Sequence, residues 1–191
     1  ALKGLFSQWG RDEPGLSGPA AGGRMKEKLL YDPIRQKWVT ATPEERVRQA
    51  LVKKMVDACG YPQELLSVEK DLKELPHLKN CALPLPDRRA DLICFCKEIH
   101  PLYSYYPLLL VECKRDRIDE RGRRQLMGYN HFVQAFFIAL AAPEAFELGY
   151  FNKAQGKYCF HHVLPSYSQL LEKTRWADSP SSGRNPALKP G

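Results

Sequence analysis

Three charged side chains stand at the ends of apolar stretches, in an arrangement that suits acid–base or metal chemistry. Asp91 directly precedes one apolar stretch, whereas Glu112, Cys113 and Lys114 end the apolar run 108–111. In an extended strand, residues two apart project to the same face. Glu112 and Lys114 therefore point together, and Cys113 points the other way, into the core. A carboxylate and an ammonium at the tip of a strand built for burial indicate a functional role.

The elements that carry these side chains are predicted to be neighbouring strands. Residues 89–96 and 108–114 are strongly apolar, and we interpret the short connection at 100–107 as a turn region. Consecutive strands with a short connection pair as antiparallel neighbours. The start of one strand then faces the end of the next, which brings Asp91 beside Glu112.

Two carboxylates that converge repel one another, and burying them is expensive. A hard divalent cation offsets that cost, and Mg²⁺ favours one or two carboxylates together with waters and phosphate oxygens. Such a metal generates hydroxide from bound water, and the Lys114 ammonium can orient that water. The pattern predicts phosphodiester hydrolysis with Mg²⁺ or Mn²⁺. The alternative is a surface salt bridge between Glu112 and Lys114, worth about 0–1 kcal/mol.

The other elements alternate in type and predict an α/β fold, with a central mixed β-sheet flanked by helices. A first helix begins with Thr42 as its N-cap and Glu45 completing a capping box, and it ends at Gly60. The remaining predicted elements are a strand at 65–70, a helix at 119–133, a strand at 135–142, a hairpin formed by 146–151 and 157–163, and a short helix over 166–173.

Composition predicts one folded domain at 25–176, between a flexible leader at 1–24 and a disordered tail at 177–191. The six cysteines form no CxxC pair, which favours reduced thiols in a cytoplasmic protein. The sequence contains no run of 18 apolar residues, so we expect no membrane span. The net charge of +7 and the pI of about 9.1 favour a polyanionic partner.

The succession of RADLICF and LLLVECK resembles the core of the PD-(D/E)xK nuclease superfamily. More closely, seven segments occur in the order found in the nuclease domain at the N-terminus of type I restriction enzyme motor subunits. These segments are YDPIRQKWV (31–39), TPEERVRQ (42–49), GYP (60–62), SVEK (67–70), RRAD (88–91), LLLVECK (108–114) and QLMGYN (125–130). The resemblance implies a restriction-endonuclease-like fold with an αβββαβ core, and an Mg²⁺-dependent endonuclease that acts on DNA.

The same resemblance implies roles for individual residues. Asp91 would be the central metal-bridging carboxylate and Glu112 a second ligand. The Cys113 carbonyl is a further candidate ligand, and Lys114 would position the nucleophilic water.

Gln125 and Tyr129 match the QxxxY element that follows the ExK strand in several branches of the superfamily. Residues four apart share a helix face. The resemblance implies that the two side chains contact the nucleic-acid backbone or support Lys114. The alternative is an ordinary pair on a helix surface.

The first helix of these enzymes usually supplies another acid, for which Glu44 and Glu45 compete. Glu44 shares the packed face with Val47 and Leu51, three and seven residues on. Glu45 is explained by helix capping. We therefore favour Glu44 as a further metal ligand.

A basic cluster, KRDRIDERGRR, follows the ExK strand directly. We predict that this cluster contacts phosphates beside the metal through Arg115, Arg117, Arg123 and Arg124. The alternative is a solvated mixed-charge surface.

We expect DNA as the partner, with RNA, further proteins and a homodimer left open. The chain has no GxxxxGK[ST] loop, so translocation would need another protein. A competing hypothesis is a catalytically silent nucleic-acid-binding subunit of a larger complex.

Overall fold

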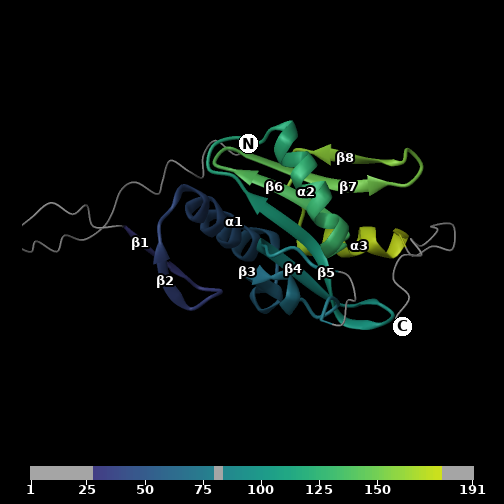
Figure 1. The fold of residues 1–191 in the computed structure, drawn as a ribbon, viewed down its shortest axis with the longest axis horizontal. Helices are drawn as coiled ribbons and strands as arrows, with labels where there is room; N and C mark the ends of the chain where they lie inside the picture. Colours follow the sequence, from purple (N-terminus) through teal and green to yellow (C-terminus); the bar gives the residue numbers. More distant parts are fainter. Residues whose placement is uncertain (1–27, 80–83, 178–191) are drawn as a thin grey trace, which may run out of the picture.

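The structure, a computed structural model, describes residues 28–79 and 84–177 (Figure 1). The predicted leader at 1–24 and nearly all of the predicted tail at 177–191 lie outside the described residues. The domain boundaries therefore remain a prediction. No helix in the described ranges is both long and apolar enough to cross a membrane.

A six-stranded mixed sheet forms the centre of the fold, in the order β3-β4-β5-β6-β7-β8. Its strands are β3 (Leu66–Asp71), β4 (Arg89–His100), β5 (Tyr103–Cys113), β6 (Phe137–Ala142), β7 (Ala145–Asn152) and β8 (Lys157–His161). The helices are α1 (Pro43–Cys59), α2 (Glu120–Val133) and α3 (Tyr167–Ala177), with short 3-10 turns at Gln63–Leu65 and Leu72–Glu74. Only the β5–β6 pair is parallel, and α2 lies in the connection between those two strands. The predicted α/β class is confirmed.

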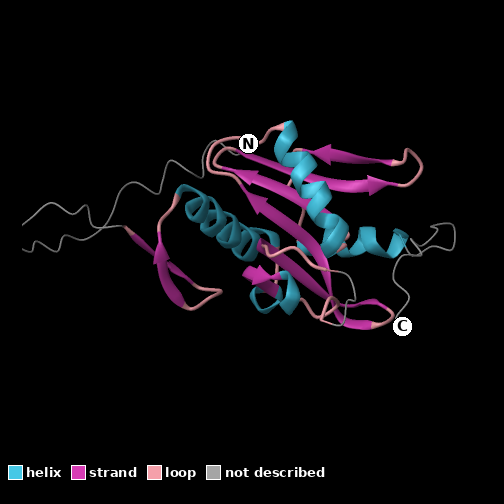
Figure 2. Cartoon of the chain, viewed as in Figure 1, coloured by secondary structure: helices cyan, strands magenta, loops and turns pink. Residues whose placement is uncertain are grey.

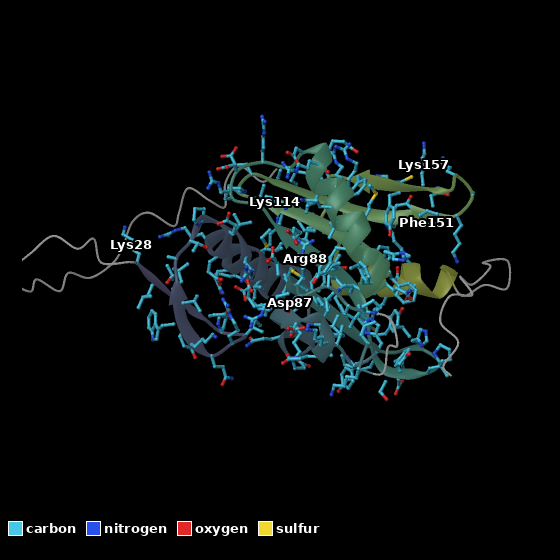
Figure 3. The ribbon with its side chains drawn as sticks, in the orientation of Figure 1. Lys28, Asp87, Arg88, Lys114, Phe151 and Lys157 are labelled. Carbon is cyan, nitrogen blue, oxygen red and sulfur yellow. The ribbon has the colours of Figure 1, made fainter. Side chains whose placement is uncertain are left out.

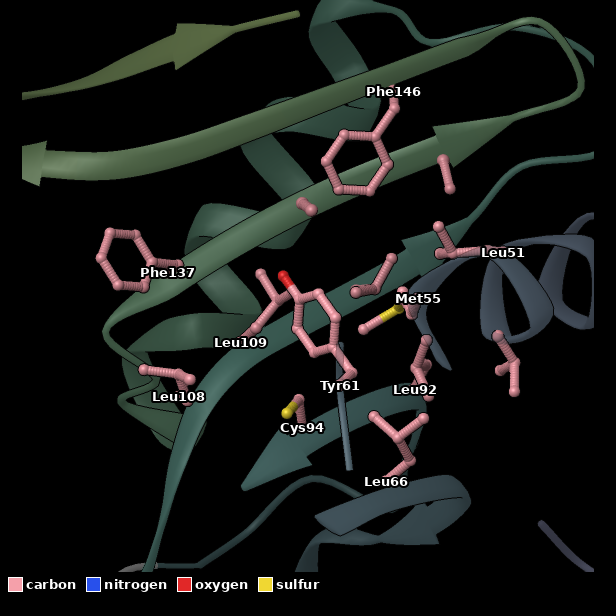
Figure 4. Packing of buried hydrophobic residues seen from close by; sticks show 14 of the residues in the cluster. Leu51, Met55, Tyr61, Leu66, Leu92, Cys94, Leu108, Leu109, Phe137 and Phe146 are labelled. Carbon is pink, nitrogen blue, oxygen red and sulfur yellow. The ribbon is translucent and has the colours of Figure 1, made fainter. Parts of the chain in front are cut away.

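The sheet separates two apolar clusters. Along β5, Leu109, Val111 and Cys113 belong to the cluster that packs under α1 and α3. Leu110 belongs to the cluster that packs under α2. Figure 4 shows Met55 of α1 lying against the first face of β4 and β5. The alternation that the sequence predicted therefore holds, and Cys113 points into the core.

The ends of α1 form as its sequence predicts, with one difference at the capping box. The Thr42 hydroxyl accepts the Glu45 N–H at 3.1 Å, and Gly60 closes the helix in a left-handed conformation, with φ of 68°. The Thr42 N–H, however, donates to the Thr40 carbonyl at 2.8 Å rather than to a side chain. The expectation that the Glu45 carboxylate completes a capping box was wrong, because that carboxylate is drawn to two arginines.

The region 100–107, predicted as a turn, is instead mostly strand. β4 continues to His100 and β5 begins at Tyr103. The rings of Tyr106 and His100 stack with their centroids 4.5 Å apart. Pro107, which has no N–H to donate, lies at a register shift and beyond the end of the β5–β6 pairing, where a proline is tolerated. Aromatic strand propensity therefore outweighs the turn signals here.

A small hairpin, β1 (Leu29–Asp32) with β2 (Lys37–Thr40), lies outside the main sheet, beside α1 (Figure 2). The Asp32 carboxylate is fully buried and accepts the N–H groups of Ile34 and Arg35. Arg35 pairs with Asp32 and also with Glu45 of α1, at 2.7 Å from Arg35 Nη2 to Glu45 Oε1. The hairpin is thus tethered to the first turn of α1 by charge, while its Trp38 ring is exposed.

Met55→Ala tests the packing of α1 on the sheet. Met55 is fully buried, and removing a buried side chain of this size lowers the free energy of unfolding by about 2–5 kcal/mol. Urea denaturation measures this change. Lys53→Ala, at an exposed position of the same helix, should change stability by no more than about 0.5 kcal/mol. A loss below about 1 kcal/mol for Met55→Ala would contradict the described packing.

Candidate active site at the ends of strands β4 and β5

The antiparallel β4–β5 register brings the predicted residues together. The pair Leu92↔Val111 places Asp91 level with Glu112. Asp91 Oδ2 accepts the Cys113 N–H at 2.7 Å. Lys114 Nζ donates to Glu112 Oε1 at 3.2 Å, and the two side chains are 25% and 20% exposed, respectively.

An open pocket of about 560 Å³ lies at this end of the sheet. It is lined by Glu44, Arg48, Asp91, Glu112, Cys113, Lys114, Arg115, Asp116, Arg117 and Asp119. Figure 3 shows Lys114 near the point where α1, β5 and α2 approach one another. Seven of the residues predicted from the sequence thus line one pocket.

Arg48 is one side chain at this site that sequence reasoning missed. It comes from α1, and its side chain is only 5% exposed. Its guanidinium lies 2.9 Å from Glu45, 2.6 Å from Glu69 and 3.4 Å from Asp91. Burial alone lowers the pKa of Arg48, but the three carboxylates together raise it above its usual value. The sequence did contain a signal for Arg48, because this charged residue follows Val47 and interrupts the apolar face of α1.

Glu69 was missed as well, although it lies within the SVEK segment. It stands in β3 between Val68 and Lys70, whose pairing partners flank Asp91. Glu69 is therefore level with Asp91, as Asp91 is with Glu112. Its backbone has a φ of 52°, in the left-handed region that residues with a side chain rarely adopt. Three neighbouring strands thus each contribute one carboxylate to the same end of the sheet.

The electrostatics of the site follow from this crowding. Burial, and then the nearby charge of Glu112, raise the pKa of Asp91 from 3.8 to about 6. The Cys113 N–H and Arg48 oppose that rise without cancelling it. Burial also raises the pKa of the Cys113 thiol, so the thiol stays neutral. The site therefore holds more negative charge than its own cations offset.

Lys114 is fixed from both ends. Its backbone N–H donates to the Ala141 carbonyl at 2.7 Å, which continues the parallel pairing of β5 with β6. Gly122 of α2 leaves room for the lysine stem, because a Cβ at that position would be 3.4 Å from Lys114 Cε and 3.2 Å from Asp119 Oδ1. Gly122 was another unpredicted residue, and its missing side chain lets α2 approach the lysine closely.

Comparison with known families identifies the chain. Residues 43–165 match the family described as the type I restriction enzyme R protein N terminus (HSDR_N). The chain belongs to this family. The resemblance predicted from the seven segments is thereby confirmed.

One solved structure is similar to this HSDR_N chain. It is a fragment assigned to an HsdR subunit of a type I restriction enzyme from Vibrio vulnificus YJ016, with 13% identity and a TM-score of 0.42. The match covers 64% of this chain and 23% of that one. The HSDR_N chain thus spans about a quarter of the length of that relative. No curated protein matches the chain.

Within the HSDR_N chain, the two members of the QxxxY pair occupy different environments. Gln125 is exposed and does not line the pocket, whereas the Tyr129 ring is 4% exposed. The Arg88 guanidinium lies 4.9 Å from the centre of the Tyr129 ring. Burial is the main cause that raises the pKa of Tyr129, and the charges of Glu112 and Asp91 raise it further. Tyr129 therefore packs behind the site rather than facing solvent.

The predicted basic residues also divide into two groups. Arg115 and Arg117 are exposed and line the pocket. Arg123 instead makes a two-pronged pair with the buried Glu147 of β7, at 2.7 and 2.8 Å. Arg124 is exposed and stands 3.8 Å from Glu120. The pair of Arg123 with the buried Glu147 links α2 to β7.

The two acids of the first helix differ in their contacts. Glu45 is 6% exposed and accepts bonds from Arg35, Arg48 and Gln49. Its oxygens are thus already occupied. Glu44 lines the pocket, which favours it as the acid that faces a ligand.

The donor set suits a small hard cation. The described residues contain no group of three or more His, Cys, Asp or Glu side chains placed to hold a metal. Asp91 and Glu112 nevertheless converge, and burial together with the charge of Glu112 raises the pKa of Asp91. Mg²⁺ requires only one or two carboxylates, with water in its other positions. The residues present therefore fit Mg²⁺ or Mn²⁺.

Asp91→Asn tests the electrostatic strain of the site. The folded-state pKa of Asp91 is raised, so its contribution to stability is present below about pH 4 and is lost as the pH rises through 6. At pH 7.5 in EDTA, the variant should be about 1–3 kcal/mol more stable than the wild type, since one pKa unit equals about 1.4 kcal/mol. The gain should vanish at pH 4.

Urea denaturation at several pH values measures this difference. Asp57→Asn, at an exposed site of α1, is the matched control and should show no pH-dependent gain. A loss of stability in Asp91→Asn at pH 7.5 would instead make Asp91 a structural ion-pair partner.

Proposed function

We propose that this chain is a metal-dependent nuclease that hydrolyses phosphodiester bonds in DNA. The observation that carries the proposal is the convergence of Asp91, Glu112 and Lys114 at one open pocket. Membership of the HSDR_N family supports it, because that family is named for a restriction enzyme subunit. The enzyme class is an Mg²⁺-dependent endonuclease, a hydrolase.

The residues that would hold the metal are Asp91 and Glu112, with the Cys113 carbonyl and Glu44 as further oxygen donors. When bound, Mg²⁺ or Mn²⁺ supplies an activated water and stabilises the charge of the leaving oxygen. The pair Glu112–Lys114 supports this arrangement, since the carboxylate also holds the ammonium in place.

Lys114 is the residue that acts on the water and the phosphate. Its ammonium is a donor in a part-buried site, where a fixed charge acts more strongly than in water. The absence of a side chain at Gly122 leaves room for the lysine stem. The ammonium can therefore orient a water for attack and offset the charge that develops on the phosphate oxygens.

Arg115 and Arg117 extend the pocket toward the substrate. Both are exposed at the pocket wall, and exposed arginines bind phosphate oxygens readily. We propose that they hold the DNA backbone beside the scissile bond. The expected partners are DNA and other proteins of a restriction complex, in the cytoplasm, although the chain is predicted to cut without a motor.

Lys114→Ala tests the catalytic proposal. Purified wild type should cut DNA with Mg²⁺ or Mn²⁺ and not with EDTA. The variant should lose at least about 10²-fold in rate, because one preorganised charge is worth that much. Lys157→Ala, at an exposed position of β8, should cut at the wild-type rate.

The competing hypothesis of a silent binding subunit predicts a different result. A folded wild type that binds DNA but cuts no linear, supercoiled, single-stranded or branched form with either metal would support that hypothesis. It would also refute the nuclease proposal. Gel analysis of the four DNA forms decides between the two.

Arg115→Ala with Arg117→Ala tests the DNA contacts. In a Lys114→Ala background, which leaves DNA intact, the double change should weaken binding at every sequence. It should also reduce the slope of log K against log salt by about 1–2, since each lost phosphate contact contributes about 0.9. The control pair Lys153→Ala and Lys157→Ala, in the exposed β7–β8 turn region, should leave the slope unchanged. An unaltered slope in the arginine variant would remove Arg115 and Arg117 from the interface.

A further inference from the structure

Three carboxylates meet at the end of the sheet, yet they do not have the same partners. Glu112 is paired with Lys114, and Asp91 accepts the Cys113 N–H. Glu69 is held by Arg48 through the shortest of the arginine's three contacts, at 2.6 Å from Nη2 to Oε1.

The same guanidinium nitrogen contacts Glu69 and Asp91, but unequally. Arg48 Nη2 lies 3.4 Å from Asp91 Oδ1, which is 0.8 Å longer than its contact with Glu69. Glu45 has a second cation beside it, because its Oε1 lies 2.7 Å from Arg35 Nη2, and the neutral Gln49 amide donates to the same oxygen at 2.7 Å. Arg48 is therefore directed mainly at Glu69.

The backbone of Glu69 supports a specific placement of its side chain. Its φ of 52° is unfavourable for a residue with a Cβ and occurs within a strand. Such a conformation persists only where the surroundings hold it. The Glu69 side chain is still 30% exposed, so a carboxylate released from Arg48 would have access to the open end of the sheet.

We infer that Arg48 determines the metal preference of this site by keeping Glu69 out of the coordination sphere. With Glu69 held, two strand carboxylates remain, which suits Mg²⁺ with its several retained waters. With Glu69 released, three carboxylates face the ion, which suits Ca²⁺ and its six to eight oxygen ligands. Arg48 is thus a positioning residue that selects the smaller cation. The inference rests on the metal-dependent function proposed above.

The test compares the affinities for Mg²⁺ and Ca²⁺, measured by isothermal titration calorimetry on the full chain without DNA. Arg48→Met should raise the Ca²⁺ affinity relative to the Mg²⁺ affinity by at least tenfold. Arg48→Met combined with Glu69→Gln should return that ratio to the wild-type value. Arg48→Lys should keep the ratio within about threefold of wild type, because an ammonium can still hold Glu69. Arg46→Met, an exposed position of α1, is the matched control and should leave both affinities unchanged.

Folding of the variants is checked by circular dichroism, because Arg48→Met leaves Glu69 and Asp91 without the cation that they share. If that variant does not fold, Glu69→Gln alone tests the inference. Without Glu69, the guanidinium is left to Asp91 and competes with the ion. Mg²⁺ affinity should therefore fall several-fold, with no relative gain for Ca²⁺. A Ca²⁺ affinity that falls at least tenfold relative to the Mg²⁺ affinity in Glu69→Gln would show that Glu69 already binds the ion in the wild type, and it would overturn the inference.

Two further outcomes separate this inference from the proposed function. An unchanged Ca²⁺-to-Mg²⁺ ratio in a folded Arg48→Met, or a ratio in the double variant that stays shifted, overturns the role of Arg48 while the nuclease proposal stands. A wild type that binds neither Mg²⁺, Mn²⁺ nor Ca²⁺ overturns both. Retained wild-type metal binding with no cleavage overturns only the nuclease proposal.

Discussion

The charge balance around Arg48 is the constraint on which the site end of this fold depends. Glu45, Glu69 and Asp91 come from three different elements and meet in a largely buried region. Without a cation among them, their mutual repulsion would oppose the docking of α1 onto the sheet, since buried charges are tolerated only when paired. Arg48 therefore links the packing of the helix to the arrangement of the acids.

Most of the fold could be predicted from local patterns, because caps, turns and alternating burial act over a few residues. Thr42 and Gly60 mark α1, and strand alternation placed Cys113 in the core. The position of Asp91 beside Glu112 followed from antiparallel pairing alone. The strand from Tyr103 was mistaken for a turn because its ring contacts with His100 are made across a hairpin, where local turn signals mislead.

Partners that depend on contacts between distant elements could not be predicted in this way. The pairing of Arg48 with Glu69 requires both the docking angle of α1 and the left-handed backbone of Glu69. The different environments of Gln125 and Tyr129 likewise depend on how α2 is rotated against the sheet. Arg123 was predicted to contact phosphates, because the sequence does not show that its partner is the buried Glu147 of β7.

The tether of the β1–β2 hairpin has a consequence for how the family segment can be transplanted. The matched segment covers residues 43–165, but Arg35, which neutralises Glu45, lies before it. Leu170 of α3, which closes the core beneath the sheet, lies after it. A graft limited to the matched segment would carry the acids without their full counter-charge and with an open core. The segment recognised by similarity is therefore shorter than the segment that a graft would have to include to keep these contacts.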